Sequence, residues 1–225
     1  MQKMTRTQKS LSLLTAGGLA LGLGASAQAE ELPAGWSLSS NVALTSNYLL
    51  RGGSESDEDP AIQGGFDLDH TSGFYIGTWG SSVALGEDST EIDFYAGYGF
   101  EVAPGFDLDL GVVAYTYYPA GDADDEEIYA GIASSVADLD YDFYLYSNSE
   151  PDITGELNLA YPIPGGVSLL GQLGFVEPDE DDGDYIYYAV GASYSYQSLD
   201  FSVMWTDTDD SESDDQFAVT VSRSF

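Results

Sequence analysis

The chain has 225 residues, of which 39 are acidic, 5 are basic and none is cysteine, and its formal net charge is −34. This charge disfavours nucleic acid and anionic lipid headgroups as direct partners, and the lack of cysteine excludes disulfides, thiolate metal sites and a lipoprotein anchor. Hydrophobic residues make up 43% of the chain and aromatic residues 13%, which argues against disorder. The acidity alone is typical of adaptation to high salt.

The first 29 residues have the pattern of a secretory signal peptide. A basic start precedes an apolar run at Leu11–Leu23, and Ala27-Gln28-Ala29 fits the small-residue cleavage site. This run is too short for a spanning helix, and no later apolar run reaches the roughly 18 residues that one needs. We expect a signal peptide at 1–29 and a single mature domain at 30–225.

Beyond the signal, apolar and polar residues alternate with a period of two, as in β-strands with one apolar face. The last ten residues show this most clearly, and they end in Phe225, like the closing strand of bacterial outer-membrane barrels. The twelve predicted segments are Trp36–Arg51, Ala61–His70, Phe74–Leu85, Thr90–Val102, Phe106–Tyr118, Glu127–Ser135, Leu139–Ser147, Ile153–Tyr161, Val167–Val176, Tyr185–Tyr196, Leu199–Thr206 and Gln216–Phe225.

The connections between these segments alternate in kind. Short turns of Gly, Pro and Ser alternate with longer acidic loops, of which the first is Gly52–Pro60. Short turns at one end and long loops at the other are typical of outer-membrane barrels, and an even strand count places both termini at the short-turn, periplasmic end. The sequence therefore predicts an all-β, up-and-down antiparallel transmembrane barrel in a Gram-negative outer membrane, with its acidic loops outside.

A secreted soluble β-sandwich is the rival fold, because it also has short alternating strands. Its outward parity would carry many charges, whereas the second parity here holds mainly Gly, Ser, Thr and Tyr. The Tyr residues and the three Trp residues often fall near segment ends, which favours an interfacial aromatic girdle.

The first hairpin carries a run that resembles a known family. It reads Thr45-Ser-Asn-Tyr48, Arg51-Gly52 and Ser54, then Pro60-Ala-Ile-Gln-Gly-Gly-Phe-Asp67, His70 and Ser72-Gly-Phe-Tyr-Ile-Gly-Thr-Trp-Gly-Ser81. This run is similar to that of the Gcw_chp type of bacterial outer-membrane proteins, although Asn47 and Leu50 replace the usual Asp and Phe. The resemblance implies an outer-membrane barrel and supplies no activity or catalytic residue.

Arg51 and Arg223 are the only basic residues after the signal. We expect Arg51 to be ion-paired in a way that constrains the first loop, or to act as a constriction residue facing luminal acids. Arg223 lies on the lipid-facing parity, near enough to the terminus to reach the headgroups or the C-terminal carboxylate.

Acidic residues on the presumed luminal parity are the candidate pore-lining groups together with Arg51. Many lie near the short turns, which predicts a carboxylate collar at the periplasmic mouth that would favour cations in an open pore. Alternatively, the acids only solvate a narrow or plugged interior. The candidates are Glu91, Asp93, Glu101, Asp107, Asp109, Asp140, Asp142, Glu156 and Asp200. The predicted collar consists of the candidates other than Glu91, Asp93 and Glu156, together with Asp67 and Asp69.

Metal binding and catalysis have little support. The acidic loop with Asp179, Asp181, Asp182 and Asp184 lacks EF-hand spacing, so it could hold divalent cations only at low affinity. His70 is the only histidine, which excludes zinc sites built on several histidines. We expect no enzyme and no cofactor.

Two functions stay open on the sequence alone. One is a narrow passive pore that favours cations or small solutes. The other is a non-conducting structural or surface-interaction barrel with ion-binding loops. The expected partners are outer-membrane lipid, cations at the acidic loops, and periplasmic chaperones and the barrel-assembly machinery, which would recognise the strand ending at Phe225.

Overall fold

The computed structural model describes residues 29–85, 89–119, 123–148, 152–178, 183–210 and 213–225. The predicted signal peptide lies, except for its last residue, outside the described residues. No helix in these ranges is long and apolar enough to cross a membrane.

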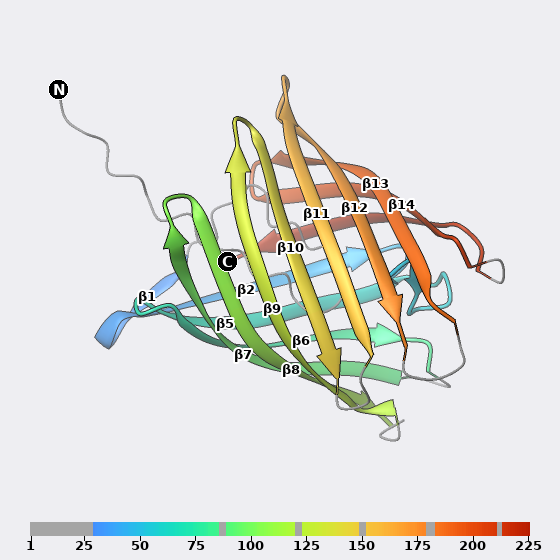
Figure 1. Ribbon diagram of the computed structural model, residues 1–225, viewed down its shortest axis with the longest axis horizontal. Helices are drawn as coiled ribbons and strands as arrows, with labels where there is room; N and C mark the ends of the chain where they lie inside the picture. The colour runs from blue at the N-terminus through green and yellow to red at the C-terminus, as the bar shows by residue number, and fades with distance from the viewer. Residues whose placement is uncertain (1–28, 86–88, 120–122, 149–151, 179–182, 211–212) are drawn as a thin grey trace.

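Twelve strands form the wall of a closed antiparallel barrel (Figure 1). Each wall strand pairs with its neighbours in the chain, and the last strand pairs with the first, from Thr45↔Thr220 to Asn41↔Ser224. The predicted up-and-down barrel is therefore confirmed. The strands are β2 (Trp36–Thr45), β5 (Ala61–His70), β6 (Phe74–Val83), β7 (Ser89–Ala103), β8 (Phe106–Tyr118), β9 (Asp125–Val136), β10 (Leu139–Asn148), β11 (Ile153–Ile163), β12 (Val167–Glu177), β13 (Tyr185–Tyr196), β14 (Leu199–Thr208) and β15 (Gln216–Ser224).

Short elements complete the described fold. β1 (Glu30–Leu32) and the 3-10 turn η1 (Pro33–Gly35) precede the barrel, and β1 pairs with the start of β2. The barrel's last residue, Phe225, exchanges two backbone hydrogen bonds with Ser40. The C-terminus and the start of the wall therefore meet at the short-turn end, as the even strand count predicts.

The two faces of the wall have opposite polarity. Large apolar side chains on one parity point outward, and Ile62, Phe66 and Phe94 are 64%, 60% and 56% exposed. Polar side chains on the other parity point into the barrel, where Glu91, Asp93 and Asp109 are at most 1% exposed. A soluble sandwich would hide the first set, so this fold contradicts that alternative.

The predicted aromatic girdle is only partly right, because many aromatic rings lie inside the barrel. Tyr98, Tyr161 and Tyr196 are exposed on the outside, but Trp79 and six tyrosines are buried. Glycines on neighbouring strands make room for several of these rings: a Cβ on Gly97 would collide with Tyr75, and one on Gly131 with Tyr144. The buried tyrosines are Tyr48, Tyr75, Tyr95, Tyr115, Tyr144 and Tyr187.

The first long connection departs from the prediction. The expected strand Trp36–Arg51 ends at Thr45, and the residues after it turn into the barrel. Gly52 and Ser56 are buried there, whereas residues 57–60 are exposed, so only the second half of the predicted outer loop faces outside. The cause lies in the polar residues of this loop, which find their partners on the inner wall.

Removal of Phe225 should impair barrel assembly. The deletion removes the two backbone bonds to Ser40 and the ring on which the Arg223 guanidinium lies, 4.6 Å from the ring centroid. In heat-modifiable gel mobility, we expect a smaller folded fraction than for the wild type. Ser224→Ala, which keeps the backbone, is the matched control. A deletion variant that assembles as well as this control would contradict the role given to Phe225.

Candidate functional site

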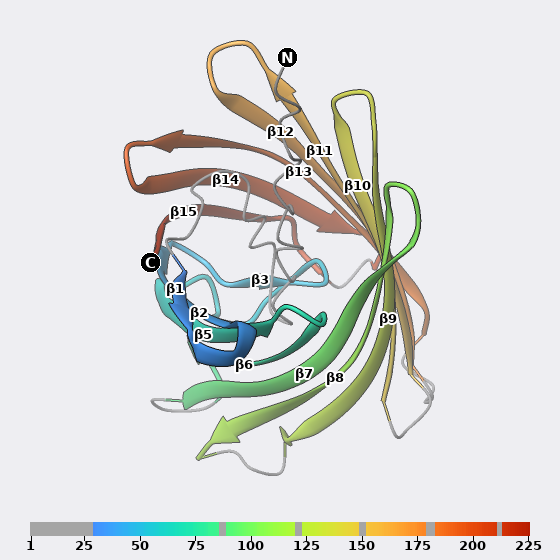
Figure 2. The same ribbon diagram turned by 90° about the vertical axis from the view of Figure 1, so that its left-hand side faces the viewer.

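A loop at residues 46–60, called here the inward loop, enters the barrel between β2 and β5 (Figure 2). Its centre is a small hairpin, in which β3 (Leu49–Leu50) pairs with β4 (Gly53–Ser54). Arg51 and Gly52 form the tip with φ angles of 47° and 89°. Two positive φ values in succession are the mark of the type I′ turn that closes two-residue hairpins. This turn places Arg51 at the tip of the loop.

Side-chain hydrogen bonds fix the base of the inward loop. Asn47 accepts from the Ser54 hydroxyl at 2.7 Å and donates to Gln216 on β15 at 3.0 Å. The Ser56 hydroxyl accepts from the Tyr48 backbone N–H at 2.9 Å and donates to the Asp59 carbonyl at 2.7 Å. The short polar residues of the first-hairpin motif therefore build this loop and give it one shape.

Arg51 pairs with Glu127 on β9, across the lumen from the base of the loop. Its Nη2 donates to Oε1 at 2.8 Å and to Oε2 at 2.9 Å, and the Tyr115 hydroxyl donates to Oε2 at 2.7 Å. The guanidinium also lies 5.5 Å from the ring centroid of Tyr146. The ion pair expected for Arg51 is present, but it joins the loop to the wall rather than to the neighbouring acids of the loop.

Two further contacts hold the inward loop against other parts of the wall. Tyr48 packs edge-on against Trp79 of β6, with ring centroids 5.4 Å apart. At the tip, a Cβ on Gly52 would lie 2.7 Å from the Cβ of Tyr187 on β13, so this position has no space for a side chain. The loop therefore contacts β6, β9 and β13 from inside the barrel.

Carboxylates and tyrosines lie in the lumen between the inward loop and the short turns. Asp109 on β8 accepts from the hydroxyls of Tyr75 at 2.7 Å and Tyr144 at 3.2 Å, and the Tyr75 and Tyr129 hydroxyls are 2.5 Å apart. Because Asp109 is buried, these donors replace the water that it would otherwise bind. This cluster joins β6, β8, β9 and β10 through polar contacts.

A second polar cluster lies on β10, β11, β12 and β13. Asn158 donates to Asp142 at 3.0 Å and to Glu156 at 2.8 Å, and it accepts from Gln172 at 3.1 Å. The Tyr187 hydroxyl donates to Glu156 at 2.7 Å. The two acids of this cluster are half-buried, so the acidic lining extends from β8 to β10 and β11.

The remaining candidates occupy different environments. Glu91 and Asp93 lie buried together on β7, beneath the inward loop. Glu101 is exposed and caps its turn by accepting from the Gly105 backbone N–H at 2.9 Å, and Asp200 accepts from Ser195 at 2.5 Å.

Asp107 and Asp140 are half-buried on the same luminal parity near the short turns. Of the two further members of the predicted collar, Asp67 accepts from Tyr95 at 2.5 Å and Asp69 is exposed. A pore-lining role for all these acids stays a prediction.

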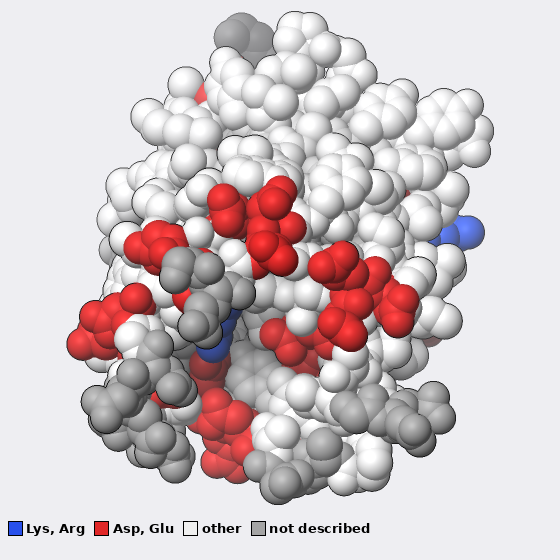
Figure 3. Space-filling model, turned by 90° about the vertical axis from the view of Figure 1, so that its right-hand side faces the viewer, with Lys and Arg blue, Asp and Glu red and all other residues white. Residues whose placement is uncertain are grey.

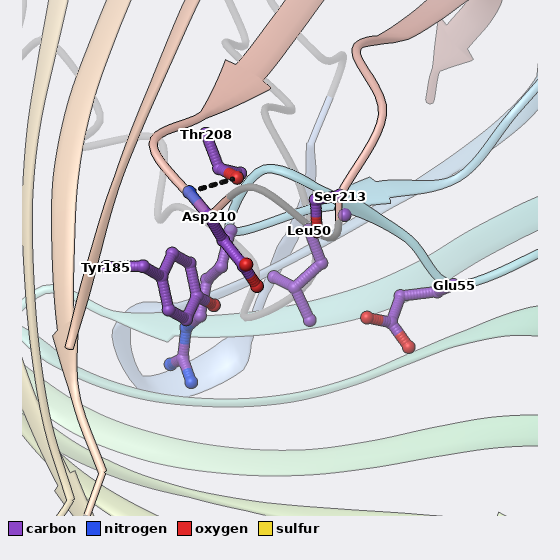
Figure 4. A pocket seen from close by; sticks show the side chains of 8 residues that line it. Leu50, Glu55, Tyr185, Thr208, Asp210 and Ser213 are labelled. Carbon is purple, nitrogen blue, oxygen red and sulfur yellow. Dashed lines mark hydrogen bonds between the residues drawn. The ribbon is translucent and has the colours of Figure 1, made fainter. Parts of the chain in front are cut away.

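A cavity of about 350 Å³ lies on the long-loop side of the inward loop (Figure 4). Leu50, Glu55, Tyr185 and Asp210 are among its lining residues, and Arg51 also contributes. Figure 3 shows acidic side chains around a hollow at this end of the molecule. Burial raises the pKa of the Glu55 carboxyl, and the charge of Arg51 offsets part of that rise. Because this pKa is raised in the folded barrel, protonated Glu55 contributes to the stability of the docked loop at low pH. That stability is lost as the pH rises through the raised pKa.

The predicted metal candidates and the histidine are not brought into one site. Asp179, Asp181 and Asp182 lie outside the described residues, and Asp184 is exposed. Within the described ranges, no three His, Asp or Glu side chains are grouped to hold a metal ion. His70 lies at the short-turn end, bonded to Ser72 and to the Ala34 carbonyl.

Sequence reasoning missed two residues of this site. Glu127 begins the predicted strand Glu127–Ser135 but is absent from the candidate luminal acids, although it shares parity with Tyr129 and Gly131 on the luminal face, and that parity was the available signal. Tyr48 falls inside the predicted strand Trp36–Arg51, so alternation alone places it in the wall. Nothing in a period-two pattern indicates that the chain turns inward after Thr45.

Comparisons with known proteins agree with this fold. The family model described as "Bacterial protein of unknown function (Gcw_chp)" matches residues 29–225, which confirms the resemblance seen in the first hairpin. No curated protein matches the chain by sequence.

Three solved structures similar to this chain are porins. A KdgM porin is 13% identical with a TM-score of 0.63, and the match covers 83% of this chain and 99% of that one. A KdgM porin in complex with disordered oligogalacturonate is 12% identical with a TM-score of 0.62, covering 84% and 98%. A NanC porin is 9% identical with a TM-score of 0.57, covering 84% and 98%. At such identities the likeness shows the fold.

Loss of the Glu127 charge should release the inward loop. Removing one partner of a buried ion pair costs about 3–5 kcal/mol, and Glu127 is 5% exposed. Trypsin can report the release, because Arg51 and Arg223 are the only basic residues after the predicted signal. We expect Glu127→Gln to be cut after Arg51 in the folded state and the wild type to resist. Glu126→Gln, on the outer parity, is the control. Equal resistance of Glu127→Gln and this control would show that the pair does not hold the loop.

Proposed function

Since the chain belongs to the Gcw_chp family of bacterial proteins, whose function is unknown, we propose its role from the barrel itself: a narrow passive pore of the outer membrane that favours cations or small neutral solutes. The observation that carries this proposal is the acidic lumen. Asp109, Asp142 and Glu156 face it from different strands, and the only nearby cation, Arg51, is already paired with Glu127. Rings of carboxylates favour cations in a pore.

The outer surface supports the membrane part of the proposal. A belt of exposed apolar side chains runs over all the wall strands, and the short turns and long loops are separated to opposite ends. Exposing such a continuous apolar surface to water is unfavourable, whereas contact with lipid tails is favourable. Because the sheet is closed, the backbone N–H and C=O groups of the wall pair with one another and need no hydrogen bonds from lipid. The porin fold of the compared structures agrees with this location.

The charge of the lumen argues against large anions as the permeating solute. One of the compared KdgM structures contains oligogalacturonate, which carries a carboxylate on each sugar unit. In this chain the carboxylates at Asp142 and Glu156 would repel such a molecule, and Arg51 does not offset them because Glu127 neutralises it. We therefore assign this pore to cations or small neutral solutes rather than acidic oligosaccharides.

A non-conducting barrel is the second candidate, and one observation favours it. Tyr48, Asp93 and Asp109 are at most 1% exposed, so the interior around them is closed in this conformation. On the pore hypothesis, the inward loop narrows the path and sets its size limit. On the alternative, the packed interior is permanent and the external loops interact with ions or a partner.

Single-channel recording in planar bilayers separates the two candidates. We expect the refolded wild type to give small steps and Arg51→Gln to give larger ones, because the variant lacks the charge that holds the loop to Glu127. Arg223→Gln changes the only other basic residue after the predicted signal, on the outer surface, and should leave the step size unchanged. If neither the wild type nor Arg51→Gln conducts, the pore proposal fails and the non-conducting barrel is favoured.

A further inference from the structure

Four polar atoms without a hydrogen-bond partner lie between the inward loop and the wall. They are the Tyr48 hydroxyl, Oε2 of Glu91 and both carboxylate oxygens of Asp93. Tyr48 and Glu91 are each 1% exposed and Asp93 is 0% exposed. Buried polar groups are nearly always paired, and a buried carboxylate with both oxygens unpaired is costly. The Tyr48 hydroxyl is close enough to Glu91 to donate to it, and Glu91 can bond Asp93 only through a shared proton, so the two carboxylates need either that proton or a cation between them.

The four atoms belong to one small space. Glu91 and Asp93 are two residues apart on β7, so both point to the luminal face, where they interact with each other. The Tyr48 hydroxyl, which comes from the inward loop, interacts with Glu91.

Aromatic side chains close this space on the wall side. Asp93 lies opposite Trp79 on β6 and Tyr115 on β8. Trp79 also packs on Tyr48, so the loop and the wall meet around the unpaired oxygens.

The charge of this space is not balanced by a basic residue. Arg51 is the only basic side chain of the inward loop, and its Nη2 donates to both oxygens of Glu127. Arg223 lies on the outer surface near the C-terminus. Among the described residues, then, two neighbouring buried carboxylates lack a positive partner, which low dielectric surroundings penalise strongly.

We propose that a monovalent alkali cation, Na⁺ or K⁺, binds between Tyr48, Glu91 and Asp93 and ties the inward loop to β7. All the unpaired atoms are oxygens, and hard oxygen ligands select hard cations over soft metals. Among the described residues no third acidic side chain joins these two carboxylates, whereas Ca²⁺ sites usually draw on several carboxylates.

This site gives the inward loop a further anchor, on β7. Arg51–Glu127 holds the tip on β9, and the cation holds Tyr48, nearer the base, on β7. The inference does not depend on conduction, since an anchored loop is compatible with either function proposed above. A test based on stability can therefore fail or succeed independently of the pore.

The test measures the midpoint temperature of heat-modifiable gel mobility for the refolded mature chain in detergent. Buffers of equal ionic strength contain NaCl, KCl, CaCl₂ or N-methylglucamine chloride. For the wild type we expect a higher midpoint in NaCl or KCl than in N-methylglucamine chloride, rising with the logarithm of the cation concentration. Asp93→Asn should lose this dependence and, without alkali cation, have a higher midpoint than the wild type, because it removes an uncompensated charge.

Asp142→Asn is the matched control, because Asp142 is a luminal acid that already has a partner in Asn158. It should keep the wild-type response to NaCl. If Asp93→Asn does not assemble, Tyr48→Phe, which removes only the hydroxyl oxygen, should lower the midpoint gain in NaCl.

Three results would overturn the proposal. The first is a wild-type midpoint that is the same in all four salts, which would indicate that Glu91 and Asp93 share a proton instead. The second is a response to CaCl₂ alone. The third is a response to NaCl that Asp93→Asn and Tyr48→Phe retain in full, which would place the cation in the external acidic loops.

Discussion

Closure of the sheet is the constraint on which the rest of this molecule depends. When β15 pairs with β2, the sheet has no edge, and each residue of the wall must face either outward or into the lumen. The period-two pattern then separates the chain into an apolar outer surface and a polar inner one. This separation is the reverse of that in a soluble barrel, and it makes lipid the natural surroundings of the fold.

The inner surface poses a packing problem that glycine and tyrosine solve together. Twelve strands enclose more space than short polar side chains fill, so large rings lie across the lumen and rest on glycines of neighbouring strands, as Tyr75 does on Gly97. The ring hydroxyls reach the carboxylates, as in the bond from Tyr75 to Asp109. The inward loop fills the wider part nearer the long loops, where Arg51 meets Glu127 and Tyr48 meets Trp79.

The even number of strands predicts that both ends of the wall lie at the short-turn end. Alternation predicts the strand positions and the outward direction of the apolar parity, since one residue of register decides which face is buried. The acids at Asp109, Asp142 and Glu156 were placed on the luminal parity for the same reason. The inward turn after Thr45 could not be predicted this way, because it depends on partners distant in sequence, such as Gln216 for Asn47 and Glu127 for Arg51. The interior position of Trp79 was also missed, since aromatic composition does not distinguish a girdle from a filled lumen.

In the proposed pore, luminal carboxylates set the charge preference. The most direct measurement is the reversal potential of the protein in planar bilayers across a KCl gradient, compared between the wild type and the double variant Asp142→Asn/Glu156→Gln. We expect a reversal potential of the sign that indicates cation preference. It should move toward zero in the double variant, whereas Asp214→Asn, in an external loop, should leave it unchanged. A reversal potential of the opposite sign, or one that the double variant does not alter, would show that these carboxylates do not set the charge preference of the pore.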